Sequence, residues 1–424
     1  MTTAGSYTGF TADPVVPSRE LLLDSGFVAD RIGSIFARRS VSRCSLRWAN
    51  YYIGESLRLA YDVAVDGRQF VMSARTFTDS AAVFERARAS AEPVDGMPGI
   101  AHDPTTQTVW WTVPNDRRLR NLGTLLEPPN RVRQSSGVAW DRSALMRYSP
   151  ECSATAQVLD ADGQVTGYAK AYGDRDALEV AEQYNRMAAS MTMLDNVRTP
   201  RALGWARPDR IVVLEPMPGR QWVQLPADVQ PVAMRHLGAA LANVHGLPTP
   251  FGRGSFQRYR PERIVHSADL VGLARNDVAT DVRRLGDRLA EEAPARAPAV
   301  NLHGDLQTQK VLFHGDQVHI LDVDRGGSGP ASADLGSVLA SVLAHQVVNP
   351  DKAVDGLGGE LLDGYRSVRS LPSEGDLRWH TAAAVVAERA IRAVNRINES
   401  TLAVLPDLVA LGEEVLEAGV LLDG

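Results

Sequence analysis

Cysteine is scarce in this chain, and long hydrophobic runs are missing. Only Cys44 and Cys152 occur among 424 residues, and neither forms a C-x-x-C pair or lies near a histidine at metal-ligand spacing, so no disulfide framework or zinc site is indicated. No segment approaches the roughly 20 apolar residues that span a bilayer. Residues 1–14 lack the basic start and apolar core of a signal peptide. We therefore expect a cytoplasmic protein with reduced thiols and no membrane partner.

An excess of basic charge is also missing. The 45 Lys and Arg residues face 51 Asp and Glu residues, which gives a formal net charge of -6. This balance does not favour nucleic acid as a partner. The hydrophobic fraction of 44% and the charged fraction of 23% are typical of soluble globular proteins. The length predicts two or three compact units, in a monomer or a homodimer.

Strand-like segments cluster in the first half of the chain. They are rich in β-branched and aromatic residues and cover residues 61–65, 69–73, 155–159, 168–172 and 211–214. The first four form two predicted hairpins, which turn at Asp66-Gly67 and Asp162-Gly163. Each hairpin is preceded by an arginine and an aromatic residue, which suggests a weak internal repeat. Two unrelated amphipathic hairpins would resemble each other equally well at this level.

The second half of the chain is helical by its pattern. From about residue 228, apolar residues recur at three- and four-residue spacing, interrupted by a short β-like segment at residues 299–324. Strands followed by helices predict an α+β fold. Proline-rich stretches near residues 91–104 and 126–131 are interpreted as linkers.

The most informative segment covers residues 301–340. It contains His303-Gly304-Asp305, a short hairpin, Asp322-Val323-Asp324 at a strand end, and a helix start with Asp334-Leu335-Gly336. This combination resembles the phosphotransferase family of aminoglycoside, choline and fructosamine kinases, and its layout is most similar to the maltokinase and actinobacterial glucosamine kinase branch. The resemblance covers residues from about 145 to 400.

The resemblance implies a bilobal, protein-kinase-like α+β fold with an extra N-terminal cap. The cap would be residues 1–140, the β-rich nucleotide-binding lobe with its hinge residues 141–225, and the mostly helical lobe with the catalytic and acceptor site residues 226–424.

The resemblance also assigns roles to the carboxylates. Phosphoryl transfer depends on positioned carboxylates and a metal ion. Asp305 would accept or orient the substrate hydroxyl. Asp322 would hold Mg²⁺ on the phosphates of ATP. His303 would brace the loop, and Asp334 would cap the following helix and tie the loop to the lobe.

Position 310 departs from the family pattern. Five residues after the catalytic aspartate the family has Asn or Gln as a second metal ligand, whereas this chain has Lys310. An ammonium group cannot ligate Mg²⁺. Either Gln309 takes over, or Asp322 and Asp324 carry the metal with water, or catalysis is degraded. Lys310 could also contact a phosphate or point to solvent.

The nucleotide side follows from the same resemblance. Lys170 would pair with the α- and β-phosphates, oriented by Glu182 or Glu179. Adenine would meet the backbone near Glu215 and Met217. A Walker-type phosphate loop is absent, so residues 149–153 would cover the phosphates instead.

The acceptor site is expected on the C-terminal helices and next to the D-x-D motif. The candidates are Asp324, Arg325, Trp379, Glu388 and Arg392. Alternatively, Trp379 is a core residue and the charged residues of the same helix form a solvent-exposed face.

Two functions compete at this stage. The first is an ATP- and Mg²⁺-dependent phosphotransferase acting on a hydroxyl of a small polar metabolite, such as a sugar, aminosugar, aminocyclitol or aminoglycoside. The second is a pseudokinase that binds nucleotide or metabolite as a regulatory module, for which Lys310 is the concrete support.

Overall fold

The chain forms two compact units. The computed structural model describes residues 9–36, 39–248, 255–295 and 297–418, so part of the N-terminal stretch considered above lies outside it. Unit 1 comprises Met1–Ala181, Ala202–Pro216 and Asn395–Ile397, and unit 2 comprises Glu182–Arg201, Met217–Val394 and Asn398–Gly424. The predicted cap and most of the predicted nucleotide-binding lobe fall within unit 1, and the division into three parts remains a prediction.

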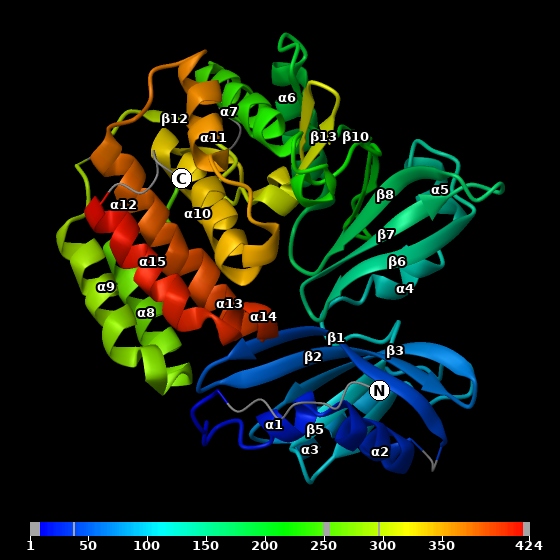
Figure 1. Cartoon of the computed structure of the whole chain (residues 1–424). Helices are drawn as coiled ribbons and strands as arrows, with labels where there is room; N and C mark the ends of the chain where they lie inside the picture. The colour runs from blue at the N-terminus through cyan, green and yellow to red at the C-terminus, as the bar shows by residue number, and fades with distance from the viewer. Residues whose placement is uncertain (1–8, 37–38, 249–254, 296, 419–424) are drawn as a thin grey trace. The chain divides into compact units, whose positions relative to one another are not determined.

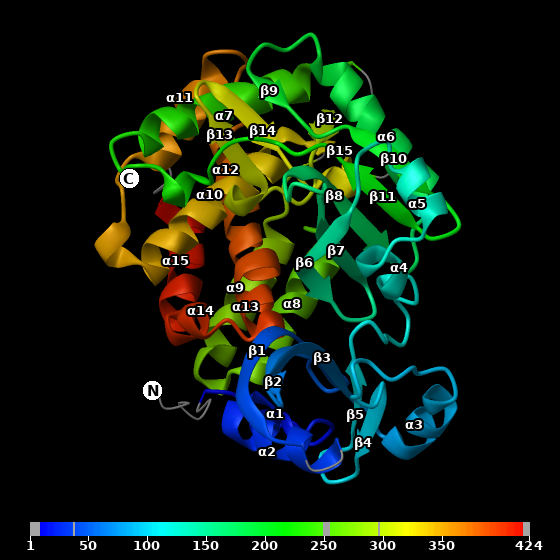
Figure 2. The ribbon, with the colours of Figure 1, turned by 90° about the vertical axis from the view of Figure 1, so that its right-hand side faces the viewer.

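Unit 1 contains two five-stranded antiparallel sheets (Figures 1 and 2). The first has the order β1-β2-β3-β5-β4 and the second the order β6-β7-β8-β11-β10. The strands of the first sheet are β1 (Val41–Tyr52), β2 (Ser56–Val65), β3 (Arg68–Thr76), β4 (Ile100–Asp103) and β5 (Thr108–Thr112). Those of the second are β6 (Arg142–Ser149), β7 (Ser153–Leu159), β8 (Val165–Tyr172), β10 (Ala202–Ala206) and β11 (Ile211–Leu214).

The two sheets therefore share one strand order. In each, three consecutive strands form a meander, and the next two described strands of the sheet add in reversed order. The predicted hairpins are confirmed as β2–β3 and β7–β8. Positive φ values of 47° at Asp66, 78° at Gly67 and 79° at Gly163 make these turns. A duplicated sequence would produce this shared order, and the duplication itself remains a proposal.

The helices of unit 1 are short. They are α1 (Arg19–Leu23), α2 (Ser25–Ile35), α3 (Ser80–Arg88), α4 (Leu122–Leu126) and α5 (Asn130–Ser135), and the first turns of α6 (Ala177–Met191) also belong to this unit. The linker interpretation of residues 91–104 is wrong at its end, because residues 100–103 form strand β4, whereas the stretch at residues 126–131 does connect α4 to α5. Trp110, in β5, is fully buried and stacks on Tyr61 with 5.5 Å between the ring centroids, so β5 contributes to the core.

Unit 2 is mostly helical. Its main helices are α7 (Gln230–Gly246), α8 (Pro261–Ala274), α9 (Ala279–Glu291), α10 (Ala331–Val348), α11 (Leu357–Arg366), α12 (Glu374–Ala384), α13 (Ile391–Arg396), α14 (Glu399–Ala403) and α15 (Leu405–Ala418). Two small sheets accompany them. One pairs β12 (Ala299–Leu302) with β15 (Gly327–Pro330), and the other has the order β13 (Val311–His314), β14 (Gln317–Ile320), β9 (Val197–Arg198).

Close packing places α7 against α11. Gly238 and Gly364 allow this close packing because neither has a side chain. A Cβ at Gly238 would lie 1.9 Å from the carbonyl oxygen of Leu361, and a Cβ at Gly364 would lie 1.9 Å from the carbonyl oxygen of Arg235. Helix α10 is apolar enough and long enough to cross a membrane by composition alone, but 67% of it is buried in the protein. It is therefore a core helix of unit 2, and it contacts β12 and β15.

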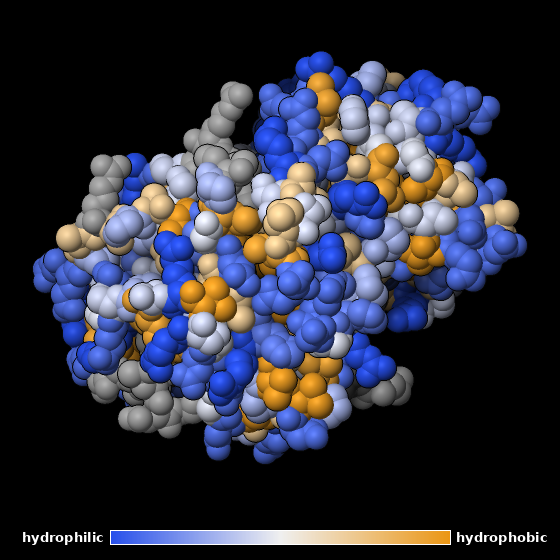
Figure 3. Space-filling model, turned by 90° about the horizontal axis from the view of Figure 1, so that it is seen from above, coloured by the Kyte–Doolittle hydropathy of each residue, from blue (hydrophilic) through white to orange (hydrophobic). Residues whose placement is uncertain are grey.

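The exposed large hydrophobic side chains belong to separate elements. Met193 follows α6, Val232 lies in α7, and Leu273 lies in α8. On the face shown in Figure 3, hydrophobic residues form small groups between hydrophilic ones. Such scattered exposure is normal for a protein surface and needs no partner to explain it.

Candidate active site

The loop after β12 carries the H-G-D motif, and helix α10 holds it. The carboxylate of Asp334 accepts hydrogen bonds from the backbone N–H groups of His303 (2.7 Å) and Gly304 (3.0 Å). Asp334 lies in the first turn of α10, where a carboxylate is favoured by the helix dipole. The N-cap position is Pro330 and has no side-chain cap. Asp334 therefore ties the loop to the helix but does not cap it, which corrects half of its expected role.

Gly304 gives the loop its turn. Its φ is +75°, and a Cβ at this position would lie 2.6 Å from the carbonyl oxygen of Arg325. Both the left-handed backbone and the lack of space require glycine.

His303 is buried and braces the same loop. Its Nδ1 accepts from the backbone N–H of Asp305 at 3.2 Å, so Nε2 carries the proton and donates to the Leu321 carbonyl at 2.9 Å. Burial, together with the nearby Lys310, lowers the pKa of His303. A neutral histidine with both ring nitrogens engaged is a structural residue, in line with the bracing role expected for it.

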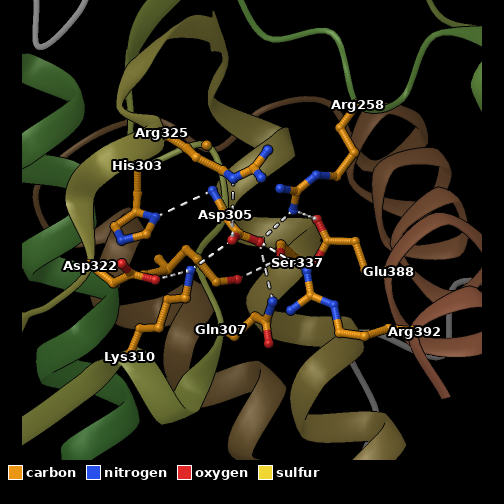
Figure 4. Close-up of polar contacts among 12 residues, drawn as sticks. Arg258, His303, Asp305, Gln307, Lys310, Asp322, Arg325, Ser337, Glu388 and Arg392 are labelled. Atoms are coloured by element: carbon orange, nitrogen blue, oxygen red, sulfur yellow. Dashed lines mark hydrogen bonds and ion pairs between the residues drawn. The ribbon is translucent and has the colours of Figure 1, made fainter. Parts of the chain in front are cut away.

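Asp305 lies at the centre of a group of cations (Figure 4). Its Oδ1 accepts from Arg258 at 2.6 Å and Arg392 at 3.1 Å, and from the amide of Gln307 at 3.2 Å. Its Oδ2 accepts from Lys310 at 2.7 Å. Burial alone would raise the pKa of Asp305, but Arg258, Lys310 and Arg392 outweigh it and hold the pKa far below its usual value. Asp305 is therefore a carboxylate throughout the physiological pH range.

Lys310 joins the two motifs. Its ammonium group lies 2.7 Å from Asp305 Oδ2 and 2.9 Å from Asp322 Oδ2. Asp322 occupies a left-handed backbone position with φ 58° and ψ 48°, directly before the short 3₁₀ turn η4 (Val323–Arg325). The D-x-D strand end therefore turns sharply, and the Asp322 carboxylate meets the same cation as Asp305 (Figure 4).

Glu388 anchors the opposite side of the site. Its Oε1 accepts from Arg258 at 2.6 Å and from the Tyr259 hydroxyl at 2.7 Å, and its Oε2 accepts from Ser337 at 2.7 Å and Arg389 at 2.8 Å. The side chain is 1% exposed. Burial would raise its pKa, but Arg389, Arg258 and Tyr259 lower it to about 2.

Glu388 lies in a π-helical segment, Val385–Ala390, between α12 and α13. Such a wider turn is often found at functional sites. One nitrogen of Arg258 bonds both Glu388 and Asp305, so the buried Glu388 positions the cation that contacts the catalytic candidate.

Several predicted site residues are brought together by the fold. Arg325 is 70% exposed and has its Nε 4.0 Å from Asp305 Oδ2, and Arg392 is 37% exposed. The residues gathered around Asp305 are Asp322, Arg325, Glu388 and Arg392.

Other predicted site residues lie elsewhere. Trp379 is buried, and its indole N–H donates to the Leu289 carbonyl at 2.9 Å, so it belongs to the core and the substrate role expected for it is corrected. Gln309 is exposed, and its amide donates to Gln307 at 2.6 Å instead of approaching the carboxylates. Asp324 is half-buried in the turn after Asp322.

Arg258 and Gln307 were missed by the sequence reasoning. Arg258 precedes α8 in a loop with no periodic pattern, and only its distant contacts to Asp305 and Glu388 reveal it. Gln307 lies within the motif segment, two residues after Asp305, and this spacing was the one available signal. Lys310 was noticed as a departure, but its two ion pairs were not foreseen.

The residues expected on the nucleotide side are divided between the units. Lys170 lies in β8, where its ammonium group is 5.2 Å from the centre of the Tyr172 ring. Glu182 belongs to unit 2 and lies 3.7 Å from Arg186 of its own helix. Glu215 and Met217 are half-buried on either side of the unit boundary after β11. The roles of these four residues remain predictions.

The described side chains around Asp305 do not form a divalent metal site. Within the described residues, no three or more His, Cys, Asp and Glu side chains form a group that could hold a metal. Between Asp305 and Asp322 lies the ammonium of Lys310, which donates hydrogen bonds and has no lone pair to give. The residues present therefore do not fit a divalent ion bound between these two carboxylates and position 310.

With this geometry in place, the chain can be compared with known proteins. Residues 157–371, about half of the chain, match the model of the phosphotransferase enzyme family. The chain belongs to this family and is therefore a phosphotransferase enzyme. No curated protein matches the chain significantly.

Several solved structures are weakly similar. A choline/ethanolamine kinase family protein from Mesorhizobium loti is 15% identical, with a TM-score of 0.47 over 70% of this chain and 94% of that one. A putative fructosamine-3-kinase from Thermobifida fusca is 19% identical, with a TM-score of 0.44 over 68% and 98%. An aminoglycoside phosphotransferase from Streptomyces rimosus is 20% identical, with a TM-score of 0.43 over 64% and 98%. The family assignment rests on the family match and not on these likenesses.

Proposed function

We propose that the chain transfers the γ-phosphoryl group of ATP to a hydroxyl of a small polar metabolite, and that Asp305 is the residue that receives this hydroxyl. The candidates are a sugar, an aminosugar, an aminocyclitol or an aminoglycoside. The observation that carries the proposal is the buried, ionised Asp305 carboxylate, held between Arg258 and Lys310 in the H-G-D loop. We also propose that the enzyme works in the cytoplasm as a monomer or a homodimer, with a divalent ion that arrives on the nucleotide phosphates.

The geometry defines how Asp305 would act. A carboxylate with a strongly lowered pKa is a weak base, so it first orients the hydroxyl by accepting its hydrogen bond. As the oxygen–phosphorus bond forms and the bond to the leaving ADP breaks, the hydroxyl becomes acidic and its proton passes to Asp305. Little base strength is needed in this reaction, because the transition state is loose and most catalysis is positioning and electrostatics.

The cations around Asp305 have a second use. Arg325 and Arg392 remain partly exposed beside it, where a guanidinium can stabilise charge on the transferred phosphoryl oxygens. Arg258 is instead neutralised by the buried Glu388 and holds the carboxylate in place.

The test is ADP release by wild type and Asp305→Asn across a panel of sugars, aminosugars, aminocyclitols and aminoglycosides. We expect turnover with one acceptor class and a loss of about 10²- to 10⁴-fold in kcat in the variant, with nucleotide binding retained. Asp316→Asn is the matched control, because Asp316 is exposed in the β13–β14 turn. Equal activity of Asp305→Asn and Asp316→Asn would contradict the role of Asp305. Nucleotide binding without turnover on any acceptor would favour the regulatory alternative.

A further inference from the structure

The contact between Lys310 and two aspartates is the most unusual feature of the site. Its ammonium group lies within 3 Å of both Asp305 Oδ2 (2.7 Å) and Asp322 Oδ2 (2.9 Å), and the side chain is 12% exposed. These are the two carboxylates to which the family motifs assign the substrate hydroxyl and the metal. Two carboxylates that both lie within 3 Å of one point repel each other unless a cation occupies that point. In this chain that cation is part of the protein.

The chemistry of the contact excludes a metal ion at the same point. The oxygens of Asp305 and Asp322 that face each other both accept from the ammonium group. Mg²⁺ binds oxygen ligands at about 2.0–2.1 Å and in nearly ideal octahedral geometry. Lys310 provides no ligand atom, and Gln309, the neighbouring amide, donates to Gln307. A divalent ion could bind between the two aspartates only if the ammonium left.

The residue type supports a specific function for this charge. The chain contains 42 arginines and three lysines, namely Lys170, Lys310 and Lys352. The other cations on Asp305, Arg258, Arg325 and Arg392, are all arginines. A guanidinium is a planar fork, whereas an ammonium is a compact charge with three rotatable donors that can replace an ion between two carboxylates. The position between Asp305 and Asp322 therefore carries one of three lysines in a chain that otherwise places arginines around Asp305.

We propose that Lys310 is a built-in cation that takes the place of one divalent ion between Asp305 and Asp322. The inference rests on the proposed function, because it concerns the same site. Lys310 is a positioning residue: it holds the catalytic carboxylate and the D-x-D carboxylate in fixed relation without contacting the transferred group. The nucleotide then brings one divalent ion fewer than it would bring to the same site with asparagine at position 310.

The first experiment counts metal ions. Mn²⁺ binding in the presence of the non-hydrolysable analogue AMP-PNP is followed by electron paramagnetic resonance for wild type, Lys310→Asn and the control Lys352→Asn. Lys352 is exposed in the 3₁₀ turn Pro350–Lys352. We expect Lys310→Asn to bind one more Mn²⁺ per nucleotide than wild type, and Lys352→Asn to match wild type. A wild type that already binds two Mn²⁺ per nucleotide, or a Lys310→Asn that gains none, would overturn the inference but leave the proposed function standing.

The second experiment needs neither activity nor nucleotide. Thermal unfolding of wild type and Lys310→Asn is measured with and without Mg²⁺, which also shows whether the variant folds. We expect Mg²⁺ to raise the Tm of Lys310→Asn by roughly 5 to 10 °C at a hundredfold excess over its Kd and to leave wild type unchanged. Equal shifts in the two proteins would refute a built-in cation. Failure of wild type to bind AMP-PNP in the first experiment would refute the proposed function, and the inference about Lys310 would then be decided by the Mg²⁺-dependent Tm shifts, which need no nucleotide.

Discussion

Replacement of Arg258 by alanine should destabilise unit 2, because this arginine neutralises a buried carboxylate. One nitrogen, Nη1, lies 2.6 Å from both Asp305 Oδ1 and Glu388 Oε1. Without the guanidinium, the buried Glu388 keeps Arg389, Tyr259 and Ser337, but loses the cation that it shares with Asp305. The charge of Glu388 then lies in a low-dielectric interior with less compensation.

The magnitude follows from Glu388. Its pKa of about 2, in place of the ordinary 4.5, corresponds to roughly 3 kcal/mol of stabilisation of the charged form. Breaking a buried ion pair on one side costs about 3–5 kcal/mol in other proteins. Because Asp305 and Glu388 both retain other partners, we expect Arg258→Ala to lower the free energy of unfolding by about 3 kcal/mol, the lower end of this range. This loss corresponds to a fall in Tm of roughly 6 to 12 °C.

Thermal unfolding followed by circular dichroism measures this effect. Arg366→Ala is the matched control, since Arg366 forms an exposed pair with Asp363 at 3.0 Å in α11, and loss of such a pair costs about 1 kcal/mol or less. The double variant Arg258→Ala/Glu388→Gln should cost less than the sum of the single variants, because it removes both charges. If Arg258→Ala and Arg366→Ala unfold at the same temperature, the buried network does not stabilise the protein and the reasoning is refuted.

Two further predictions concern buried carboxylates. The pKa of Glu388 is lower in the folded protein than in the unfolded chain, so wild type should be more stable than Glu388→Gln above pH 4.5 and should lose this advantage as the pH falls through about 2. Urea denaturation at several pH values measures the difference in unfolding free energy. A difference that does not depend on pH would contradict this prediction. Glu151, at φ 66° in the loop before β7, pairs with Arg117 at 2.6 Å and Arg75 at 2.5 Å. Glu151→Gln should lower the free energy of unfolding by about 3 kcal/mol. It should also raise the KM for ATP more than it lowers kcat, since this loop is proposed to cover the phosphates. Glu55→Gln, at an exposed position, should have neither effect, and equal effects of the two variants would count against the loop contact.

The lesson for site prediction lies in the difference between motif residues and their partners. The roles of Asp305, Asp322 and Asp334 were expected because the short motifs that carry them resemble those of the phosphotransferase family. Glu388 and Arg392 were also predicted, as charges on one helix, but their contacts were not. Trp379 was misplaced because helical periodicity predicts which residues share a face, and not whether that face meets the core or the site.

The amino-acid sequence was enough to predict the α+β class, the two hairpins with their Asp-Gly turns, and the H-G-D and D-x-D motifs. These features depend on local backbone preferences and on residues close together in the chain, which pattern reasoning can follow. The network of Arg258, Glu388 and Asp305, whose members lie up to 130 residues apart in the chain, became visible only in the folded protein. The tertiary structure also decided that Lys310 lies between two aspartates and not in solvent. The physical reason is that a buried charge takes the partner that folding places beside it, and that choice depends on packing between distant elements.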